Sequence, residues 1–242
     1  MSKNDTSDKI KYDYQFTLPN DRQVGYKIVI DSRTLIREPI EPKKEHIHWT
    51  QLENHKCSHC PLDPKRHSHC PVAKNVSEVI DDWDGIQPHD EVFVECRAAE
   101  RWISGTTEAQ KALGSFMGLI MASSECPHFD FFKPMARFHL PLASHEETNF
   151  RSIGSFVLAH YLAGDIAETP VIQEMEEIYN RLETVNYYIS QRLRDFENKS
   201  TAIGAVVVLD LMSKKMNDFI EEGIHDLQTM FLPYLNQIKH RM

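Results

Sequence analysis

The sequence predicts an α+β fold with an N-terminal antiparallel hairpin sheet, a cysteine-rich insertion and a mainly helical C-terminal half. Two periodicities lead to this class: apolar residues alternate near the N-terminus, and they recur every three or four positions in the last third. We expect a β-rich lobe over residues 1–105, with an insertion over 54–75, and a helical lobe over 106–242. No change in composition marks a linker, so the lobes are predicted to form one continuous unit.

The strands follow from strict alternation of apolar and polar side chains. Residues 10–18 alternate in this way, which predicts a strand with one buried face. Turn residues at 19–21 and a second alternating run over 24–30 complete a hairpin. A third short strand is expected near 34–37, and another hairpin over 91–104.

Helix starts can be placed by their capping residues. Apolar spacing predicts a helix over residues 72–83, with Cys70 at its N-cap and Pro71 at its first position. Two capping boxes predict further starts. They are Thr107 with Gln110, for a helix to about residue 123, and Ser144 with Glu147, for one that ends near residue 164.

The last third is predicted to be helical throughout. Thr169 can cap a helix that Pro170 begins and Phe196 ends, with an apolar seam along its length. The next segment, residues 202–212, is apolar on nearly all sides, so we expect it to be buried and to pack antiparallel to its predecessor. Pro233 should break the final amphipathic piece. The seam is also long enough to form a homodimer through the C-terminal helices.

Composition narrows the functional classes. The net charge of -9 makes a nucleic-acid partner unexpected. The N-terminus shows no secretory signal, and no apolar run approaches the roughly 18 residues that a membrane span needs. We therefore expect a cytoplasmic protein without a membrane partner. In that reducing compartment, five cysteines point to metal, redox chemistry or burial instead of disulfides.

Four of the cysteines form a candidate metal site. Cys57 and Cys60 have the spacing at which a tight turn can direct two sulfurs to one ion. Cys70 follows at a predicted helix N-terminus, where the helix dipole favours a thiolate. Cys126 is the best candidate for the fourth ligand, although it lies far along the chain. Cys96 falls on an alternating strand and is expected to be a small core residue.

The sequence leaves the occupant of this site open. Three of the four cysteines precede a proline, which is common around iron–sulfur clusters and slightly favours a cluster. His59, His67 and His69 favour zinc instead, since they could complete a Cys/His site without Cys126. An unoccupied cluster and a reactive Cys57–Cys60 dithiol are the alternatives.

A weaker candidate metal site lies in the segment before the cysteines. His46 and His48 would share one face of an extended segment and could bind a metal with His55, but exposed loop histidines are the simpler interpretation. Motifs for nucleophilic hydrolases, nucleotide-binding loops and zinc proteases are absent from the sequence.

The stretch after Cys126 mixes aromatic and basic residues between two predicted helices. Lys133 and Arg137 could hold an anion there, although a packed crossover is the simpler interpretation. If the protein is an enzyme, its pocket is expected near Arg137 and His139, beside the aromatic pair at 131–132.

The stretches "WTQLENHKCSHCPLD", "HCPVA", "SSECP" and "KPMARFHLPLAS", taken in this order, resemble a family of bacterial proteins catalogued only as a domain of unknown function. The resemblance covers most of the chain. It implies that Cys57, Cys60, Cys70 and Cys126 belong to the family pattern, and it implies no activity.

The leading hypothesis is a cytosolic metal-binding protein with a regulatory, sensory or structural role. The alternatives are a metal- or thiol-dependent enzyme with a pocket near Arg137 and His139, and a helical dimerisation module with an unoccupied cysteine cluster.

Overall fold

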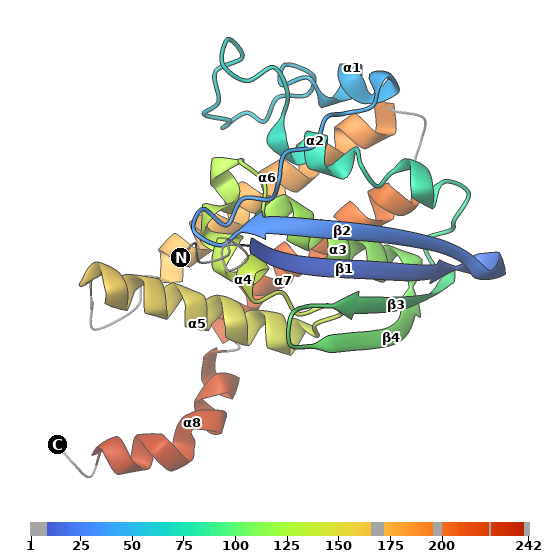
Figure 1. Cartoon of the computed structure of the whole chain (residues 1–242). Coiled ribbons are helices and arrows are strands. Elements are labelled where there is room, and N and C mark those ends of the chain that lie inside the picture. Colours follow the sequence, from blue (N-terminus) through green and yellow to red (C-terminus); the bar gives the residue numbers. More distant parts are fainter. Residues whose placement is uncertain (1–8, 166–171, 196–199, 223, 240–242) are drawn as a thin grey trace, which may run out of the picture.

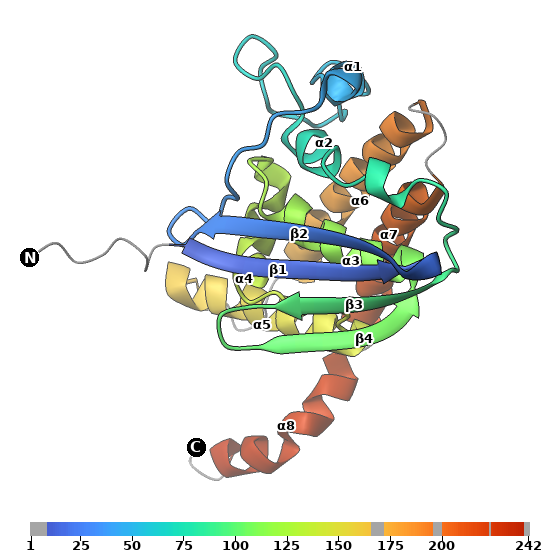
Figure 2. The same cartoon turned by 45° about the vertical axis from the view of Figure 1, so that its right-hand side comes forward.

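The protein, described here as a computed structural model, has one sheet with its helices packed behind it (Figures 1 and 2). The structure describes residues 9–165, 172–195, 200–222 and 224–239. The helices are α1 (Ile47–Thr50), α2 (Pro71–Val76), α3 (Ala109–Ala122), α4 (Lys133–Arg137), α5 (His145–Ala163), α6 (Ile172–Asp195), α7 (Ser200–Glu222) and α8 (Ile224–Lys239), and the 3-10 helices are η1 (Pro19–Asp21), η2 (Lys44–His46), η3 (Asp81–Trp83) and η4 (Pro127–Phe132). The predicted α+β class, with a mainly helical C-terminal half, is confirmed.

The sheet is antiparallel, in the order β2-β1-β3-β4. Its strands are β1 (Lys9–Leu18), β2 (Arg22–Asp31), β3 (Glu91–Arg97) and β4 (Trp102–Glu108). Alternate side chains of β1 are buried, as the period of two predicts. Both predicted hairpins are confirmed, and Cys96 is buried on β3, paired with Tyr14 of β1.

The predicted third strand near residues 34–37 is wrong. After β2, the carboxylate of Asp31 accepts the backbone N–H of Thr34 at 2.8 Å, and Leu35 adopts a positive φ of 56°. This turn leaves only an isolated bridge between Ile30 and Arg37. The backbone N–H of Arg37 instead donates to the carbonyl oxygen of Ser123, which attaches the segment to the end of α3.

The start of α3 also differs from the prediction. Thr107 lies in β4, opposite Val92, so it cannot serve as a helix cap. The strand continues to Glu108 and α3 begins at once. The first free N–H group of the helix, on Ala109, donates to the carbonyl oxygen of Asp90 at 2.8 Å. A backbone acceptor therefore replaces the predicted capping box.

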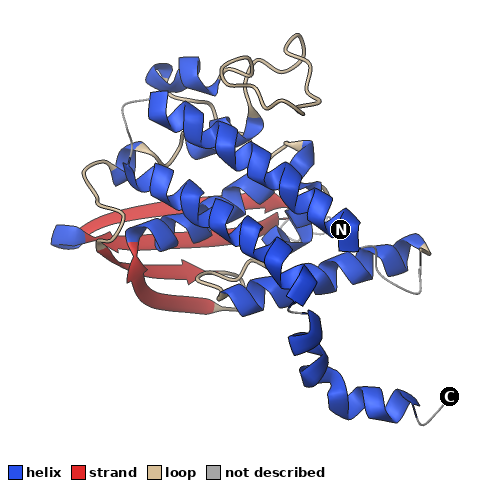
Figure 3. Cartoon of the chain, turned by 180° about the vertical axis from the view of Figure 1, so that it is seen from behind, coloured by secondary structure: helices blue, strands red, loops and turns tan. Residues whose placement is uncertain are grey.

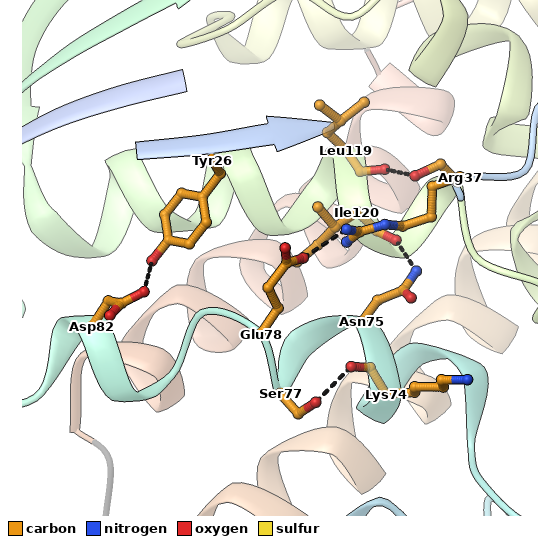
Figure 4. Close-up of polar contacts among 10 residues, drawn as sticks. Tyr26, Arg37, Lys74, Asn75, Ser77, Glu78, Asp82, Leu119 and Ile120 are labelled. Carbon is orange, nitrogen blue, oxygen red and sulfur yellow. Dashed lines mark hydrogen bonds and ion pairs between the residues drawn. The ribbon is translucent and has the colours of Figure 1, made fainter. Parts of the chain in front are cut away.

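Helix α2 is shorter than the predicted helix over residues 72–83. It ends at Val76 and is followed by turns and η3. Cys70 is its N-cap and Pro71 its first residue, as predicted. The buried amide of Asn75 donates to the carbonyl oxygen of Ile120 at 2.8 Å and joins α2 to α3 (Figure 4).

Helix α3 is the central element behind the sheet. Most of its side chains are buried, because the sheet lies on one side and α7 on the other. Helices α6 and α7 pack side by side over it (Figure 3). The predicted cap of α6, Thr169 with Pro170, and its predicted end at Phe196 lie outside the described residues. The capping box of α5 is confirmed: Ser144 accepts the N–H of Glu147 at 3.1 Å.

Two predictions for the C-terminal helices are wrong. Helix α7 is not buried on all sides: Val207 and Leu211 are 41% and 49% exposed, because α3 and α6 cover one side only. Helix α8 continues through Pro233. The flanking Leu232 and Tyr234 are exposed, so solvent can satisfy the carbonyl that proline leaves unpaired. None of the helices within the described residues is long and apolar enough to cross a membrane.

Candidate metal centre

The segment between α1 and α2, residues 51–70, contains no helix or strand, and we name it the cysteine loop. It projects beside α1 and α2 at one end of the molecule (Figures 1 and 2). A bridge between Gln51 and His69 closes its base, and the N–H of Cys70 donates to the carbonyl oxygen of Thr50 at 2.8 Å. Loops of this length without regular structure are uncommon unless they carry a function.

Cys57 and Cys60 lie in a tight turn of this loop. The backbone N–H of Cys60 donates to the carbonyl oxygen of Cys57 at 3.0 Å. Both side chains are partly buried against the core. The turn is the geometry that the Cys-x-x-Cys spacing predicts.

Cys70 and Cys126 occupy equivalent positions on two different elements. Each is the N-cap of a helical turn, α2 or η4, and each precedes the proline that begins the turn. Burial raises the pKa of the Cys126 thiol, whereas the backbone N–H of His128 lowers it. The two cysteine–proline pairs therefore place buried sulfurs at helix starts, where free N–H groups favour a thiolate.

Besides burial, neighbouring cysteines raise the pKa values of three of the four thiols, those of Cys57, Cys70 and Cys126. Burial raises the pKa of Cys126, and the charges of Cys70, Cys57 and Cys60 raise it further. The pKa of Cys57 is raised to about 12 by burial, and then by Cys70 and Cys60. A direct contact agrees with this proximity: His128, two residues after Cys126, places its Nε2 3.2 Å from the carbonyl oxygen of His59, which lies between Cys57 and Cys60.

Cys96 does not belong to this group. Its pKa is raised to about 12 by burial, Tyr14 lowers it through a hydrogen bond and Asp13 raises it. None of the four other cysteines contributes to that shift. The sequence-based assignment of Cys96 to the core agrees with this separation.

A buried arginine that sequence reasoning missed holds the cysteine loop to α6. Arg192 is 1% exposed, and its guanidinium donates to the carbonyl oxygens of Trp49, Gln51 and Leu52 at 2.6, 2.7 and 3.1 Å. Burial lowers the pKa of this guanidinium, and the charges of three of the cysteines raise it. Nothing in the sequence distinguishes Arg192 from its exposed neighbour Arg194.

The candidate histidines lie around the loop in different environments. His59 Nε2 lies 3.0 Å from the carbonyl oxygen of Arg181, and its Nδ1 is buried without a hydrogen-bond partner among the described residues. A ring that donates to a carbonyl from one nitrogen leaves the other available to a metal. His69 Nδ1 contacts the Thr50 hydroxyl at 2.9 Å, and His67 is exposed.

The segment with His46 and His48 is helical and not extended, so the period of two that predicted a shared face does not apply. His46 ends η2 and His48 lies in α1. His55 pairs with Asp195 of α6. Within the described part of the chain, no group of three or more Cys, His, Asp or Glu side chains is arranged so that it could hold a metal ion as it stands. The four cysteines are thus neighbours and not a preformed ligand set.

The second candidate region surrounds a cavity of about 450 Å³. His139 lines it, but Arg137 does not; Arg137 is exposed and lies over the Phe138 ring. Lys133 pairs with Asp130 one turn away. The described residues that line the cavity include no cysteine. The pocket and the thiols that the enzyme hypothesis combines are therefore separate.

Comparison with known proteins gives a family but no function. No curated protein matches the chain, and no solved structure matches it. A family model does match, over residues 10–232, which include the sheet from its second residue, the cysteine loop and α8 as far as Leu232. The chain belongs to DUF6901, a domain of unknown function.

Proposed function

We propose that Cys57, Cys60, Cys70 and Cys126 bind a single metal centre, an iron–sulfur cluster or zinc. The observation that carries this proposal is geometric: Cys57 and Cys60 share a tight turn of the cysteine loop, and His128, two residues after Cys126, contacts the His59 carbonyl oxygen in that turn at 3.2 Å. Four neighbouring thiols, two of them buried, cannot all ionise unless a cation compensates their charge, and thiolate ligands are what such metals bind.

The local structure supports this chemistry at Cys70. Burial raises the pKa of the Cys70 thiol, and three groups oppose this rise. They are the Arg192 guanidinium and, at the start of α2, the backbone N–H groups of Ala73 and Val72. N–H groups and cations near sulfur also tune the potential of iron–sulfur clusters.

A bound metal would stabilise the cysteine loop, which has few buried side chains of its own. The loop has no regular structure, and among its side chains only Leu52 and Cys70 are buried. Because the ligands are not preformed, closure of the loop would accompany metal binding. The role would be structural for zinc, and regulatory or sensory for a labile cluster, in the reducing cytoplasm where thiols persist.

The environment supports a cluster first and zinc second. Two of the ligands sit at cysteine–proline helix starts, as is common around clusters. His59, with a buried unpartnered Nδ1, supports the Cys/His zinc alternative. The two occupants predict different compositions of the purified protein.

Purification without oxygen, followed by assays for iron, acid-labile sulfide and zinc, tests the proposal. A cluster predicts iron and sulfide in equal amounts with visible absorption, and zinc predicts one ion per chain. Cys126→Ser should lower the metal content strongly, whereas Cys96→Ser should leave it unchanged. Protein that contains neither metal would refute the proposal.

We also propose that the C-terminal helices mediate homodimerisation. Helix α8 extends away from the rest of the chain (Figures 1 and 3), and four large apolar side chains on it are 45–57% exposed. They are Met230, Phe231, Leu232 and Tyr234. The Phe231 ring stacks on Phe150 of α5, so the apolar surface continues onto that helix. A second copy presents the same surface, which makes it self-complementary through a two-fold axis.

Analytical ultracentrifugation tests this second proposal. The wild-type protein should sediment as a dimer at micromolar concentration, and Phe231→Ser with Leu232→Ser should give a folded monomer. Tyr187→Ser, at a position of α6 that is even more exposed (57% against 45% for Phe231 and Leu232), is the control and should remain dimeric. A monomeric wild-type protein would contradict the proposal.

A further inference from the structure

The cavity of about 450 Å³ lies behind the sheet and is lined by residues of α3, α4, α5, α6 and α7. Its volume is in the range of small-molecule sites, which is about 300–1,000 Å³. Met121, Met135, Met212 and Met216 line it together with leucines and phenylalanines. Methionine side chains adapt readily to apolar ligands of irregular shape. The walls therefore suit an apolar molecule.

One polar side chain in this wall has no partner. Asn186 of α6 lines the cavity and is 1% exposed. Its amide oxygen and its amide nitrogen both lack a hydrogen-bond partner among the described residues. An amide buried in this state is destabilising, because both of its polar atoms have lost water without gaining another partner. A ligand with a polar group that both donates and accepts would satisfy the two atoms at once.

The charges around the cavity restrict which ligand charge it can accept. Lys111 and Arg151 line it, and the described lining residues include no aspartate or glutamate. Arg151 donates to the carbonyl oxygens of Met135 and Phe138 at 3.1 and 2.7 Å, which fixes its guanidinium in place. Lys111 is paired with Glu108 at 3.3 Å, but no carboxylate among the described lining residues faces Arg151, so a cationic ligand would be repelled by this guanidinium. A neutral polar group, or an anionic one, is favoured.

We infer that this cavity binds an apolar molecule, of alkyl-chain type, whose single polar end is an amide or a carboxylic acid that pairs with Asn186. The site is separate from the cysteines, because no cysteine lines it. Ligand binding in this cavity is therefore expected to be independent of metal binding at the cysteines.

Isothermal titration calorimetry with three probes of similar length tests the inference. Octanamide both donates and accepts, methyl octanoate only accepts, and octylamine is a cation. Octanamide should bind, methyl octanoate about tenfold more weakly because one hydrogen bond is lost, and octylamine more weakly still. Failure of octanamide to bind, or equal affinity for all three probes, would overturn the inference.

Matched variants identify the contact. Asn186→Leu should lower the affinity for octanamide about tenfold, to that of methyl octanoate, and should not lower the melting temperature of the free protein. Asn180→Leu makes the same change at an exposed position of α6 and should have no effect on binding. Met212→Trp, which narrows the cavity with a larger side chain, should weaken the binding of every probe. Unchanged octanamide binding in Asn186→Leu or Met212→Trp would contradict the assigned site.

Discussion

The sheet with α3 and the cysteine loop are stabilised in different ways. Behind the sheet, aromatic rings pack directly: Phe116 lies 4.9 Å from Tyr14 and 4.8 Å from Tyr26 between ring centroids. The cysteine loop has no such cluster, and its ends are held by backbone hydrogen bonds and by Arg192. The first region can form from its own side chains. The second has few buried side chains of its own, so under the proposed function its order should depend on a bound metal.

The largest expected effect is a loss of order in the cysteine loop while the sheet with α3 stays folded. Cys70→Ser should abolish metal binding and leave residues 51–70 open to proteolysis, while the sheet keeps its circular dichroism signal. Removal of the metal with a chelator should have the same effect. Limited proteolysis with mass spectrometry locates the cleavage sites.

Cys96→Ser is the control for that experiment, because its thiol lies apart from the other four. It should change neither the metal content nor the cleavage pattern of the loop. Cleavage of the loop in the metal-loaded wild-type protein at the same rate as in Cys70→Ser would show that the metal does not order it.

Substitution of Arg192 should also destabilise the cysteine loop, because it removes hydrogen bonds to backbone carbonyls and not a metal ligand. Arg192→Leu leaves the buried carbonyl oxygens of Trp49 and Leu52 without their charged donor, so we expect a loss of about 3 kcal/mol in the free energy of unfolding. Urea denaturation measures it. Arg194→Leu, at an exposed position two residues on, should cost less than about 0.5 kcal/mol. Equal effects of the two changes would exclude the proposed role of Arg192.

Acid should weaken the region behind the sheet. Burial, with a smaller contribution from Arg151, lowers the pKa of His139 from 6.5 to about 3. Below pH 6.5 the unfolded chain binds a proton that the folded chain does not, so stability falls as the pH falls towards 3. The loss from His139 should reach about 2 kcal/mol at pH 5. Urea denaturation as a function of pH measures this, and His139→Gln should reduce the slope by one proton.

The smallest expected effect concerns the junction of the two regions. Asn75→Ala removes the hydrogen bond from α2 to the carbonyl oxygen of Ile120 and should cost about 1 kcal/mol (Figure 4). Ser77→Ala, on the exit of the same helix, removes a local bond to Lys74 and should cost less. Thermal unfolding compares the pair, and a larger cost for Ser77→Ala would mean that the α2–α3 contact adds little.

Much of the fold was predictable because its signals are local. The period of two in β1 and β2, the capping box of Ser144 with Glu147, and Cys70 as an N-cap each depend on neighbouring residues only. Thr107 was misassigned because its strand pairing with Val92 outweighs its capping propensity. Pairing across the sheet is a tertiary effect, which a local pattern does not contain.

The candidate site has a signal in the sequence, whereas the residues that support it have none. Cysteine spacing, with a proline after three of the four, predicts Cys57, Cys60, Cys70 and Cys126 as a group, and this assignment stays a prediction. Arg192 and Asn186 gave no signal, because a single Arg or Asn on an amphipathic helix is normally exposed. Only packing of α6 against the loop and the cavity buries them.

The claim that four cysteines hold one metal is tested most directly by X-ray absorption at the metal edge of the anaerobically purified protein. We predict a first shell of sulfur at about 2.3 Å, with four sulfurs per metal ion for zinc, and an iron–iron distance in addition for a cluster. In Cys126→Ser the sulfur number should fall. A first shell made of nitrogen and oxygen, or one unchanged in Cys126→Ser, would contradict the account.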